Sequence, residues 1–206
     1  VVTVEVIIGN DTFNGTTDEN GTINIMVVPS VGGNDTNITV VVPPTDDTEG
    51  TNITYPVDIT KIKPDVTVDP IDDMKYHQET NVTGKITDED GKPIANTTVE
   101  VIIGNDTFNC TTDEEGNYVI PVVPGVVGWT NVTVHVPETG AVEEVNETVS
   151  VMVDKQVPVI VVDEIVPNPP KVGENATING TIVNEDGKPI ANATVEVIIG
   201  NDTFNG

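Results

Sequence analysis

The segment VEVIIGNDTFN occurs three times in the chain, beginning at Val4, Val99 and Val195. Successive copies lie about 95 residues apart, a spacing that identifies a tandem array of domain-sized repeats. In such arrays each unit contacts mainly its neighbours, so the chain gains length without forming a new fold. Because the copies are nearly identical, we expect a fibre or a stalk rather than a protein that shapes a unique cleft.

The repeat divides the chain into three parts. Position within the repeat assigns residues 1–64 to the later part of one unit, 65–158 to a complete unit, and 159–206 to the opening part of the next. A lone half-unit would leave strand edges and an apolar face uncovered, which stable monomers avoid. We therefore expect either an excerpt of a longer chain or a subunit that its neighbours complete.

The charge of the chain limits its partners. The 206 residues include 34 acidic and 8 basic side chains, all eight of them lysine, for a net charge of −26. Such a field repels phosphate backbones and anionic membrane surfaces, so we expect no nucleic-acid partner. No stretch approaches the roughly 18 consecutive apolar residues of a membrane span, so we expect no direct membrane insertion in this segment.

Apolar and polar residues tend to alternate along the chain, as at Val132, Val134 and Val136. Period two is typical of half-buried strands, and no stretch combines a helical stripe with capping residues. We expect an all-β fold of tandem immunoglobulin-like β-sandwich repeats with no significant helix. In the complete unit the strands are predicted near residues 65–69, 79–87, 97–103, 106–111, 117–123, 130–136 and 145–153, about the seven of an immunoglobulin-like sandwich.

Turn residues separate these strands. The sequence DGKP at residues 90–93 recurs at 186–189 and combines a residue that tolerates positive φ with one that fixes φ. Gly104 and Asn105 predict a tight hairpin between a strand rich in Val and Ile and a strand containing Thr and Phe.

Aromatic residues are scarce, but Phe13, Phe108 and Phe204 occupy the same position in the three copies. We expect these rings to be the largest side chains shared by the valine-rich interiors. Trp129 aligns with Asp35 of the first copy, so it lies outside the shared core. It is expected either to plug a loop or to mark an interface specific to the complete unit.

Asn-X-Thr triplets are the second strong signal in the sequence. Chance would supply about three of them from this composition, whereas the chain contains sixteen, and each uses Thr rather than Ser. A row of Asn and Thr facing solvent on a strand is the alternative explanation, but Ser or Gln would serve that purpose equally. We therefore predict N-linked glycans, with acceptors at Asn10, Asn14, Asn20, Asn34, Asn37, Asn52, Asn81, Asn96, Asn105, Asn109, Asn131, Asn146, Asn175, Asn179, Asn192 and Asn201.

Cys110 is the only cysteine, so no internal disulfide framework can hold the units together. Its counterparts in the other copies are Gly15 and Gly206. We expect a free thiol, with a disulfide between chains as the alternative.

Acidic clusters occur at residues 88–90, at 113–115, and at Asp69, Asp72 and Asp73. None follows the twelve-residue calcium loop, so solvated turns are expected and calcium bound between domains is the alternative. Lys75 with its counterpart Lys171, and Lys61 with Lys155, also raise the alternative of a Lys-to-Asn amide cross-link assisted by a buried acid. Apart from glycans, no cofactor is expected.

The catalytic inventory is small, because His77 and His135 are the only imidazoles and Ser30 and Ser150 the only serines. Neither histidine recurs at its counterpart in another copy. A pair of glycosidase carboxylates needs a cleft that a small sandwich seldom supplies. We therefore expect no enzymatic activity.

The stretch from Gly84 to Val99, with residues 111–118 and the second copy at 180–192, resembles the immunoglobulin-like repeats of archaeal adhesin-like proteins. Those of methanogens, which are related to bacterial immunoglobulin-like repeats, are especially similar. The resemblance covers nearly the whole chain and rests on a signature of turns and strands. It implies a secreted, glycosylated, cell-anchored array with no catalytic residues.

The sequence therefore favours a structural component of a glycosylated extracellular filament on an archaeal cell surface. Linkers at residues 61–64 and 155–158 run directly from one unit to the next and should limit the angle between them. The expected partners are neighbouring repeats or copies of the same protein. The alternative is an adhesin stalk that presents a tip domain to other cells or surfaces. A carbohydrate-binding array is a third possibility, against which the scarcity of Trp and Tyr argues.

Overall fold

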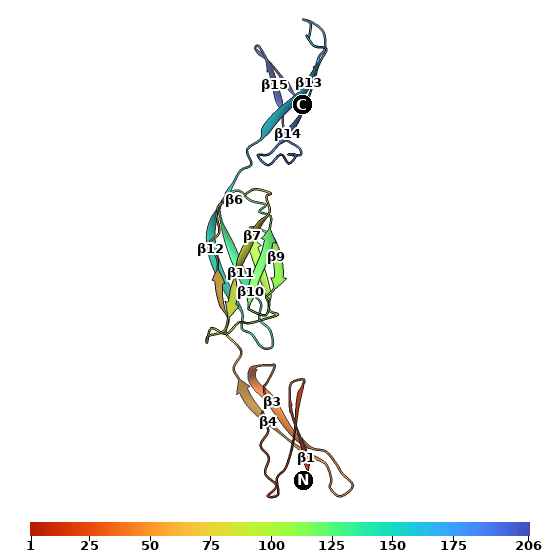
Figure 1. Ribbon diagram of the computed structural model, residues 1–206, viewed down its shortest axis with the longest axis vertical. Coiled ribbons are helices and arrows are strands. Elements are labelled where there is room, and N and C mark those ends of the chain that lie inside the picture. Colours follow the sequence, from red (N-terminus) through yellow and green to blue (C-terminus); the bar gives the residue numbers. More distant parts are fainter.

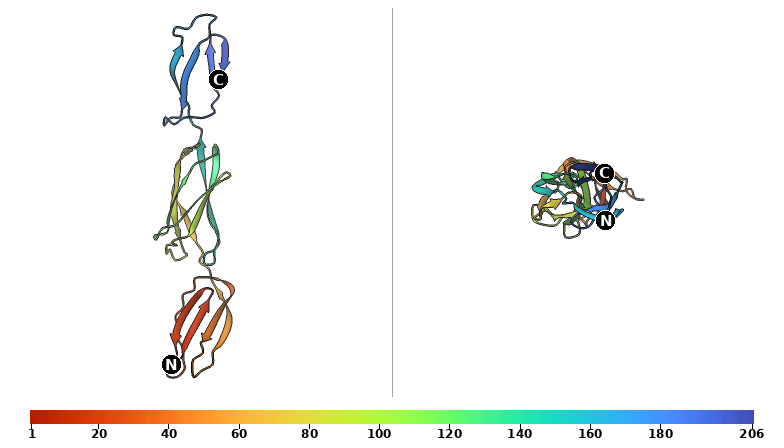
Figure 2. Two further views of the ribbon diagram at one scale, coloured as in Figure 1. Left: turned by 90° about the vertical axis from the view of Figure 1, so that its right-hand side faces the viewer. Right: turned by 90° about the horizontal axis from the view of Figure 1, so that it is seen from above.

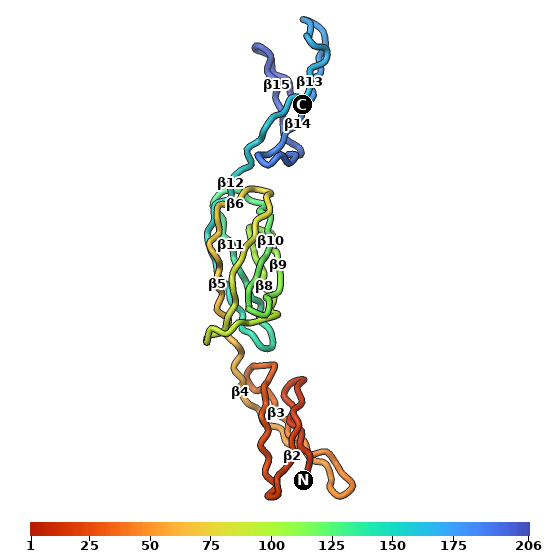
Figure 3. The backbone as a smooth tube through the Cα atoms, in the orientation of Figure 1, coloured from red at the N-terminus to blue at the C-terminus, as the bar shows by residue number.

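The computed structural model describes all 206 residues and consists of β-strands and the loops between them. Three groups of strands follow one another along a single long axis (Figures 1 and 2). The chain passes from one group to the next once at each junction, near residues 60–64 and 155–158, as the tube in Figure 3 shows. No helix in the structure is long and apolar enough to span a membrane.

The first group is a single antiparallel sheet in the order β2-β1-β3-β4. Its strands are β1 (Thr3–Ile8), β2 (Asp11–Thr16), β3 (Gly33–Val42) and β4 (Thr51–Ile59). Val4, Val6 and Ile8 alternate with more exposed residues and are buried, as period two predicts. Residues 22–27 align with β10 of the second group but form no strand. Residues 1–64 contain no copy of β7, the strand with which β10 pairs.

The second group is an immunoglobulin-like sandwich of two sheets, in the orders β10-β7-β5 and β6-β12-β11-β8-β9. Its strands are β5 (Asp65–Val68), β6 (Met74–Lys75), β7 (Thr80–Thr87), β8 (Thr98–Ile103), β9 (Asp106–Thr111), β10 (Asn117–Val122), β11 (Gly128–Val136) and β12 (Val145–Asp154). The opening segment is divided between the sheets, because β5 pairs antiparallel with β7 and β6 pairs parallel with β12. All seven predicted strands are confirmed. The two-residue strand β6 is too short to leave a pattern in the sequence.

The third group contains two antiparallel pairs, β13 with β14 and β15 with β16. Their bounds are β13 (Val159–Val166), β14 (Thr177–Val183), β15 (Glu196–Ile199) and β16 (Asp202–Asn205). The β15–β16 pair repeats the β8–β9 hairpin, in which Ile103 pairs with Asp106 across Gly104 and Asn105. Gly104 has φ of +62°, the conformation that the first turn position of a Gly-X hairpin requires.

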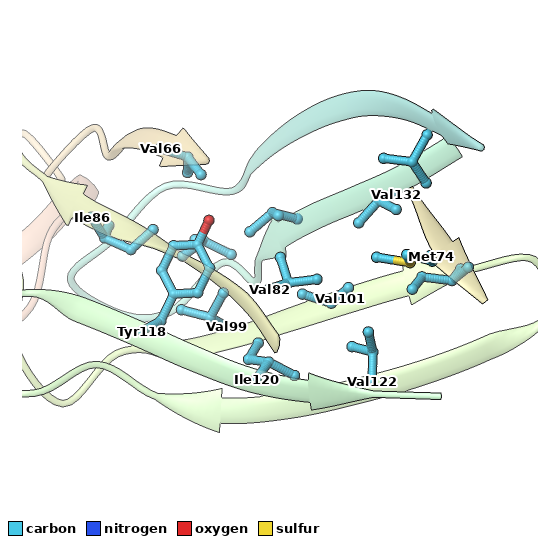
Figure 4. Close-up of a cluster of buried hydrophobic side chains, with 14 of the residues drawn as sticks. Val66, Met74, Val82, Ile86, Val99, Val101, Tyr118, Ile120, Val122 and Val132 are labelled. Atoms are coloured by element: carbon cyan, nitrogen blue, oxygen red, sulfur yellow. The ribbon is translucent and has the colours of Figure 1, made fainter. Parts of the chain in front are cut away.

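The core of the sandwich is one cluster of 17 buried residues, most of them Val and Ile. Alternate residues of each strand point inward, so both sheets contribute rows of aliphatic side chains that meet between them (Figure 4). Tyr118 is the largest fully buried side chain, and its ring lies near Val66, Ile86 and Val99 (Figure 4). Apolar burial on this scale is the main source of stability in a small domain.

The prediction that the shared phenylalanines are the largest core residues is wrong. Phe108 is only half-buried and packs against the edge of the core cluster, Phe13 is half-buried, and Phe204 is 53% exposed. All three belong to edge strands (β2, β9 and β16), which cover the core on one side only. The central position is taken by Tyr118, whose counterpart in the first copy is Ile23.

Candidate functional site

All sixteen asparagines of the Asn-X-Thr triplets are exposed to solvent. In several strands this follows from period two, because the Asn and Thr of a triplet share one face and the residue between them lies on the other. At the triplets on β7 and β11, for example, Val82 and Val132 are fully buried between exposed or half-buried neighbours. The remaining triplets lie on other strands, in turns and in loops, so candidate acceptors are distributed over all three groups.

The outward-facing residues of β12, β11, β8 and β9 form what we call the outer face of the five-stranded sheet. One row across it contains Asn146, His135, Glu100 and Asn109, which the strand register places opposite one another. Asn131 lies two rows away on β11, opposite Ser150. Three candidate acceptors of the complete unit therefore share this face.

The first group presents the same arrangement. Asn14, Asn37 and Asn52 occupy the positions of Asn109, Asn131 and Asn146 in the repeat, on strands of the same order. The threonines between them also recur. The hydroxyl oxygens of Thr39 and Thr54 are 2.9 Å apart, and those of their counterparts Thr133 and Thr148 are 3.0 Å apart. These hydrogen-bonded pairs across neighbouring strands stabilise the outer face in both units.

Two asparagines outside the triplets have structural roles instead. Asn184 is buried, and its Oδ1 accepts hydrogen bonds from the backbone N–H groups of Asp186 and Lys188. Asn117 donates a side-chain hydrogen bond to Asp113. The buried asparagine is thus found where no glycan acceptor is predicted.

Trp129 lies on β11, which contradicts the prediction that it plugs a loop. It pairs with Met152 of β12, its side chain is 72% exposed, and it stands on the outer face in line with Asn131. A shallow hollow of about 400 Å³ lies beside the ring. Its lining consists of Ile102, Gly104, Trp129, Thr130, Asn131 and Thr133.

His135 is surrounded by polar groups of the same face. Its Nδ1 lies 2.8 Å from Oδ1 of Asn146, and the carboxylates of Glu100 and Glu144 are within 4.0 Å of the ring nitrogens. Ser150 lies four residues along β12 from Asn146, so the fold does not bring this serine to the imidazole. His135 is thus a half-buried strand residue with polar contacts on the outer face.

The acidic turns use their oxygens to hold the backbone. Oδ1 of Asp88 accepts hydrogen bonds from the N–H groups of Asp90 and Lys92, and Oδ1 of Asp113 does the same for Glu115 and Asn117. The hydrogen bonds to Asn117 hold the pKa of the Asp113 carboxyl below its usual value. Asn184 replaces Asp88 in the next copy because an amide oxygen accepts the same two bonds. No group of three or more His, Cys, Asp or Glu side chains is arranged to hold a metal ion.

Cys110 is half-buried on β9 and packs against the core cluster. Burial raises the pKa of its thiol. A raised pKa lowers the fraction of reactive thiolate at neutral pH.

The junction between the first two groups is built from backbone hydrogen bonds. Ile62 donates to the carbonyl of Ala141 at 2.8 Å and accepts from the N–H of Glu143 at 2.8 Å. Gly32 donates to the carbonyl of Gly140 at 2.7 Å, and Lys61 forms an ion pair with Glu138. The linker is therefore held against the second unit like a short parallel strand, as the bridge between Ile62 and Val142 indicates.

The junction between the second and third groups uses side chains. Lys75 forms an ion pair with Glu185, and Gln78 donates a hydrogen bond to Asp186 over 2.9 Å. Both acceptors belong to the turn that repeats residues 89–90 of the second unit. The lysines that raised the possibility of an amide cross-link, Lys61 and Lys75, thus contact exposed glutamates of a neighbouring unit and no buried acid. These contacts join residues far apart in the sequence and could not be read from it.

The chain is similar to one protein family and to several solved structures. Residues 81–162 match the family model described as the carboxypeptidase regulatory-like domain. No curated protein sequence matches the chain.

Three structures represent the solved proteins that are similar. A Ca²⁺-stabilized adhesin with which an Antarctic bacterium binds ice is 20% identical over 100% of this chain and 54% of its own, with a TM-score of 0.36. Invasin, a bacterial integrin-binding protein, is 16% identical over 99% of this chain and 46% of its own, with a TM-score of 0.40. A β-glucuronidase from Parabacteroides merdae is 10% identical over 71% of this chain and 21% of its own, with a TM-score of 0.29. The chain thus spans about half the length of the adhesin and of invasin.

Proposed function

We propose that this chain is a non-catalytic structural segment of a glycosylated extracellular filament on an archaeal cell surface. The observation that carries the proposal is the end-to-end succession of the three strand groups, with a specific set of contacts at each junction. Units joined in this way transmit tension along one axis, and a repeat adds length without adding a new surface. The archaeal surface is supported by the resemblance of the turn-and-strand signature.

The junctions support a thread of limited flexibility. A linker that is hydrogen-bonded to the next unit on both its N–H and C=O sides, as Ile62 is, cannot swing as a free Gly/Ser linker does. The ion pairs at Lys61 and Lys75 add orientation more than stability, because exposed ion pairs contribute only about 0–1 kcal/mol. Neighbouring units should therefore bend within a narrow range.

The exposed triplets support a glycan coat. Every candidate acceptor side chain is exposed to solvent. Glycosylation would replace one Nδ2 hydrogen of each acceptor by a bond to the anomeric carbon of a sugar. The activated sugar donor of the cell loses its phosphate leaving group in that step, and the released proton goes to solvent. Sugars and the net charge of −26 would keep neighbouring threads soluble and separate.

An adhesin stalk is the second candidate, and the same end-to-end arrangement favours it. In a stalk the repeats would carry a distinct tip domain away from the cell, whereas in a filament the repeats would pack against copies of the same protein. Electron microscopy of native surface material separates the two. Ordered threads much longer than one chain, measured against its mass on a denaturing gel, would favour the filament, and threads of single-chain length the stalk.

Glycopeptide mapping of the native protein tests the coat. We expect sugar on most of the sixteen triplets, with occupied sites in all three strand groups. A native mass equal to that of the bare 21.8 kDa polypeptide over these residues would overturn the proposal.

A further inference from the structure

Trp129 and Asn131 stand next to each other on the same face of β11. They are two residues apart in a strand, so their side chains point to the same side, with Cα atoms roughly 7 Å apart. The strand register confirms this placement, because their partners on β12, Met152 and Ser150, are also two residues apart. A large group attached to the Asn131 side chain would therefore lie within reach of the indole ring.

The surface beside this pair forms a shallow, open hollow. The hollow has a volume of about 400 Å³, which lies within the range of roughly 300–1,000 Å³ typical of small-molecule sites. Its lining combines the indole ring and the aliphatic side chain of Ile102 with Asn131 and Thr133 of the same face. A pyranose ring has the matching chemistry, since one face presents C–H groups to an aromatic ring and its edge presents hydroxyls.

The indole of Trp129 leaves a large apolar ring surface open to water on the outer face. The equivalent position of the first unit has no aromatic side chain. There Asn34 and Asp35 form a bulge opposite Asp58, where the register of β3 and β4 shifts. In the second unit the register from Gly128 onward is regular. The ring is thus a feature of one unit, and it lies beside one candidate acceptor.

We propose that Trp129 is the docking platform for the first sugar ring of an N-linked glycan on Asn131. The inference rests on the proposed function, since it requires this triplet to carry a glycan. The sugar stacks on the exposed face of the indole and occupies the hollow that Ile102 and Thr133 help to line. The glycan is thereby held down on the outer face of the sheet, and the ring is shielded from water.

Trp129 should bind the attached sugar in preference to a free one, because attachment raises the local concentration of the sugar at the ring. A sugar tethered to Asn131 meets the ring at an effective concentration in the millimolar range or above. A free oligosaccharide must instead give up its translational freedom to a shallow, open hollow. A single aromatic ring is therefore enough to hold the tethered sugar, whereas it would bind a free oligosaccharide only weakly.

The fluorescence of the chain tests the proposal directly, because Trp129 is its only tryptophan. The full chain is produced in a host that glycosylates Asn-X-Thr, and acrylamide quenching is compared between the parent, Asn131→Gln and Asn81→Gln. Asn81 is a matched control, since it is an exposed acceptor on β7 of the opposite sheet. We expect the quenching constant to rise by about twofold in Asn131→Gln, because stacking covers one of the two ring faces, and to stay unchanged in Asn81→Gln.

A second measurement does not depend on quenching. In NMR spectra of the glycosylated chain, protons of the sugar on Asn131 should be shifted upfield by the indole ring current, and Trp129→Leu should abolish the shift. Equal quenching of the parent and Asn131→Gln, with Asn131 shown to be occupied, would overturn the inference. The same holds if added free oligosaccharide shields Trp129 while the Asn131 glycan does not.

Glycopeptide mapping distinguishes this inference from the function on which it rests. A bare Asn131 beside occupied triplets elsewhere overturns the docking platform and leaves the glycan coat standing. Bare asparagines at all sixteen triplets overturn both.

Discussion

The hydroxyl of Tyr118 donates a hydrogen bond to the backbone carbonyl of Thr67 over 2.9 Å and so joins β10 to β5 across the intervening strand β7. The bond passes directly over Gly84. A Cβ atom at this position would overlap both the Thr67 carbonyl oxygen and the Tyr118 hydroxyl. The three residues therefore form one packing unit, in which the missing side chain of Gly84 makes room for the tyrosine.

Gly84→Ala should consequently destabilise the second unit by about 1–3 kcal/mol, the usual cost of forcing an extra carbon into a packed site. Urea unfolding of the full chain measures the change. Gly206→Ala is the control, since a Cβ there meets no atom within 4 Å. Equal stabilities of the two variants would show that the three-strand contact is absent in solution.

Tyr118 also predicts a pH dependence. Burial, with a smaller contribution from Asp69, raises the pKa of its phenol above the usual value of 10.0. A raised folded-state pKa means that the unfolded chain ionises first. The contribution of this ionisation to the free energy of unfolding is fully present below pH 10. It is lost as the pH rises from there towards the folded-state pKa, by up to about 1.4 kcal/mol per pH unit.

Tyr118→Phe isolates this dependence, because the titration of lysines and other tyrosines is common to both proteins. At neutral pH the variant should be less stable by about 1 kcal/mol through loss of the hydrogen bond. Above pH 10 the difference in unfolding free energy between the two proteins should shrink, because only the wild-type protein has a phenol at this position to ionise. A difference that stays constant from pH 7 to pH 11 in parallel urea titrations would contradict the burial of the phenol.

The hierarchy within the core gives a third prediction. Ile120 is fully buried, and Ile120→Ala should cost about 2–5 kcal/mol through lost burial and the cavity left behind. Phe108 covers only the edge of the cluster, so Phe108→Ala should cost less, about 1–2 kcal/mol. Thermal or urea unfolding orders the two variants, and a larger loss for Phe108→Ala would place that ring in the centre of the interior.

The second junction should respond to changes that leave the units intact. Lys75→Ala together with Gln78→Ala removes both side-chain contacts to residues 185–186. We expect small-angle scattering to show a broader distribution of bending angles, while the melting temperature of the second unit falls by no more than the equivalent of about 1 kcal/mol. Lys85→Ala, on the outward side of β7, is the control for lost charge. An unchanged scattering curve would mean that the linker alone sets the angle.

The triplet asparagines should be dispensable for folding. In protein made without glycans, Asn131→Gln should change the unfolding free energy by less than about 0.5 kcal/mol, since the side chain is exposed. Asn184→Ala should cost about 1–3 kcal/mol, because the backbone donors of Asp186 and Lys188 lose their acceptor. Large losses at several triplets would favour a structural role for the Asn and Thr rows instead of glycan attachment.

The sequence predicts the regular parts of this structure well, because period two and the turn residues act locally. All seven expected strands of the complete unit are present, and the hairpin at Gly104 forms as expected. Tyr118 was not singled out as a core residue, since recurrence favoured the phenylalanines and the first copy has Ile23 at that position. The spacing of Trp129 and Asn131 places both side chains on one face of any regular strand. That the strand is regular at this point could not be predicted, since the first unit has a bulge at the equivalent position.

The contacts between units were beyond prediction. Ion pairs such as Lys75 with Glu185 join residues that are 110 positions apart, and no local pattern marks them. The division of the chain into independently folding units, with boundaries between residues 64 and 65 and between 158 and 159, remains a prediction. Limited proteolysis tests it, because fragments that begin or end near these boundaries should persist longest.

Electron cryotomography of intact producing cells, with gold-labelled antibodies against the second unit, shows whether the protein forms threads at the cell surface. We expect gold along thin threads outside the cell envelope, with label recurring at the length of one repeat or a multiple of it. Gold confined to the cell interior, or to compact particles without threads, would contradict the proposal that this protein is built to extend from a surface.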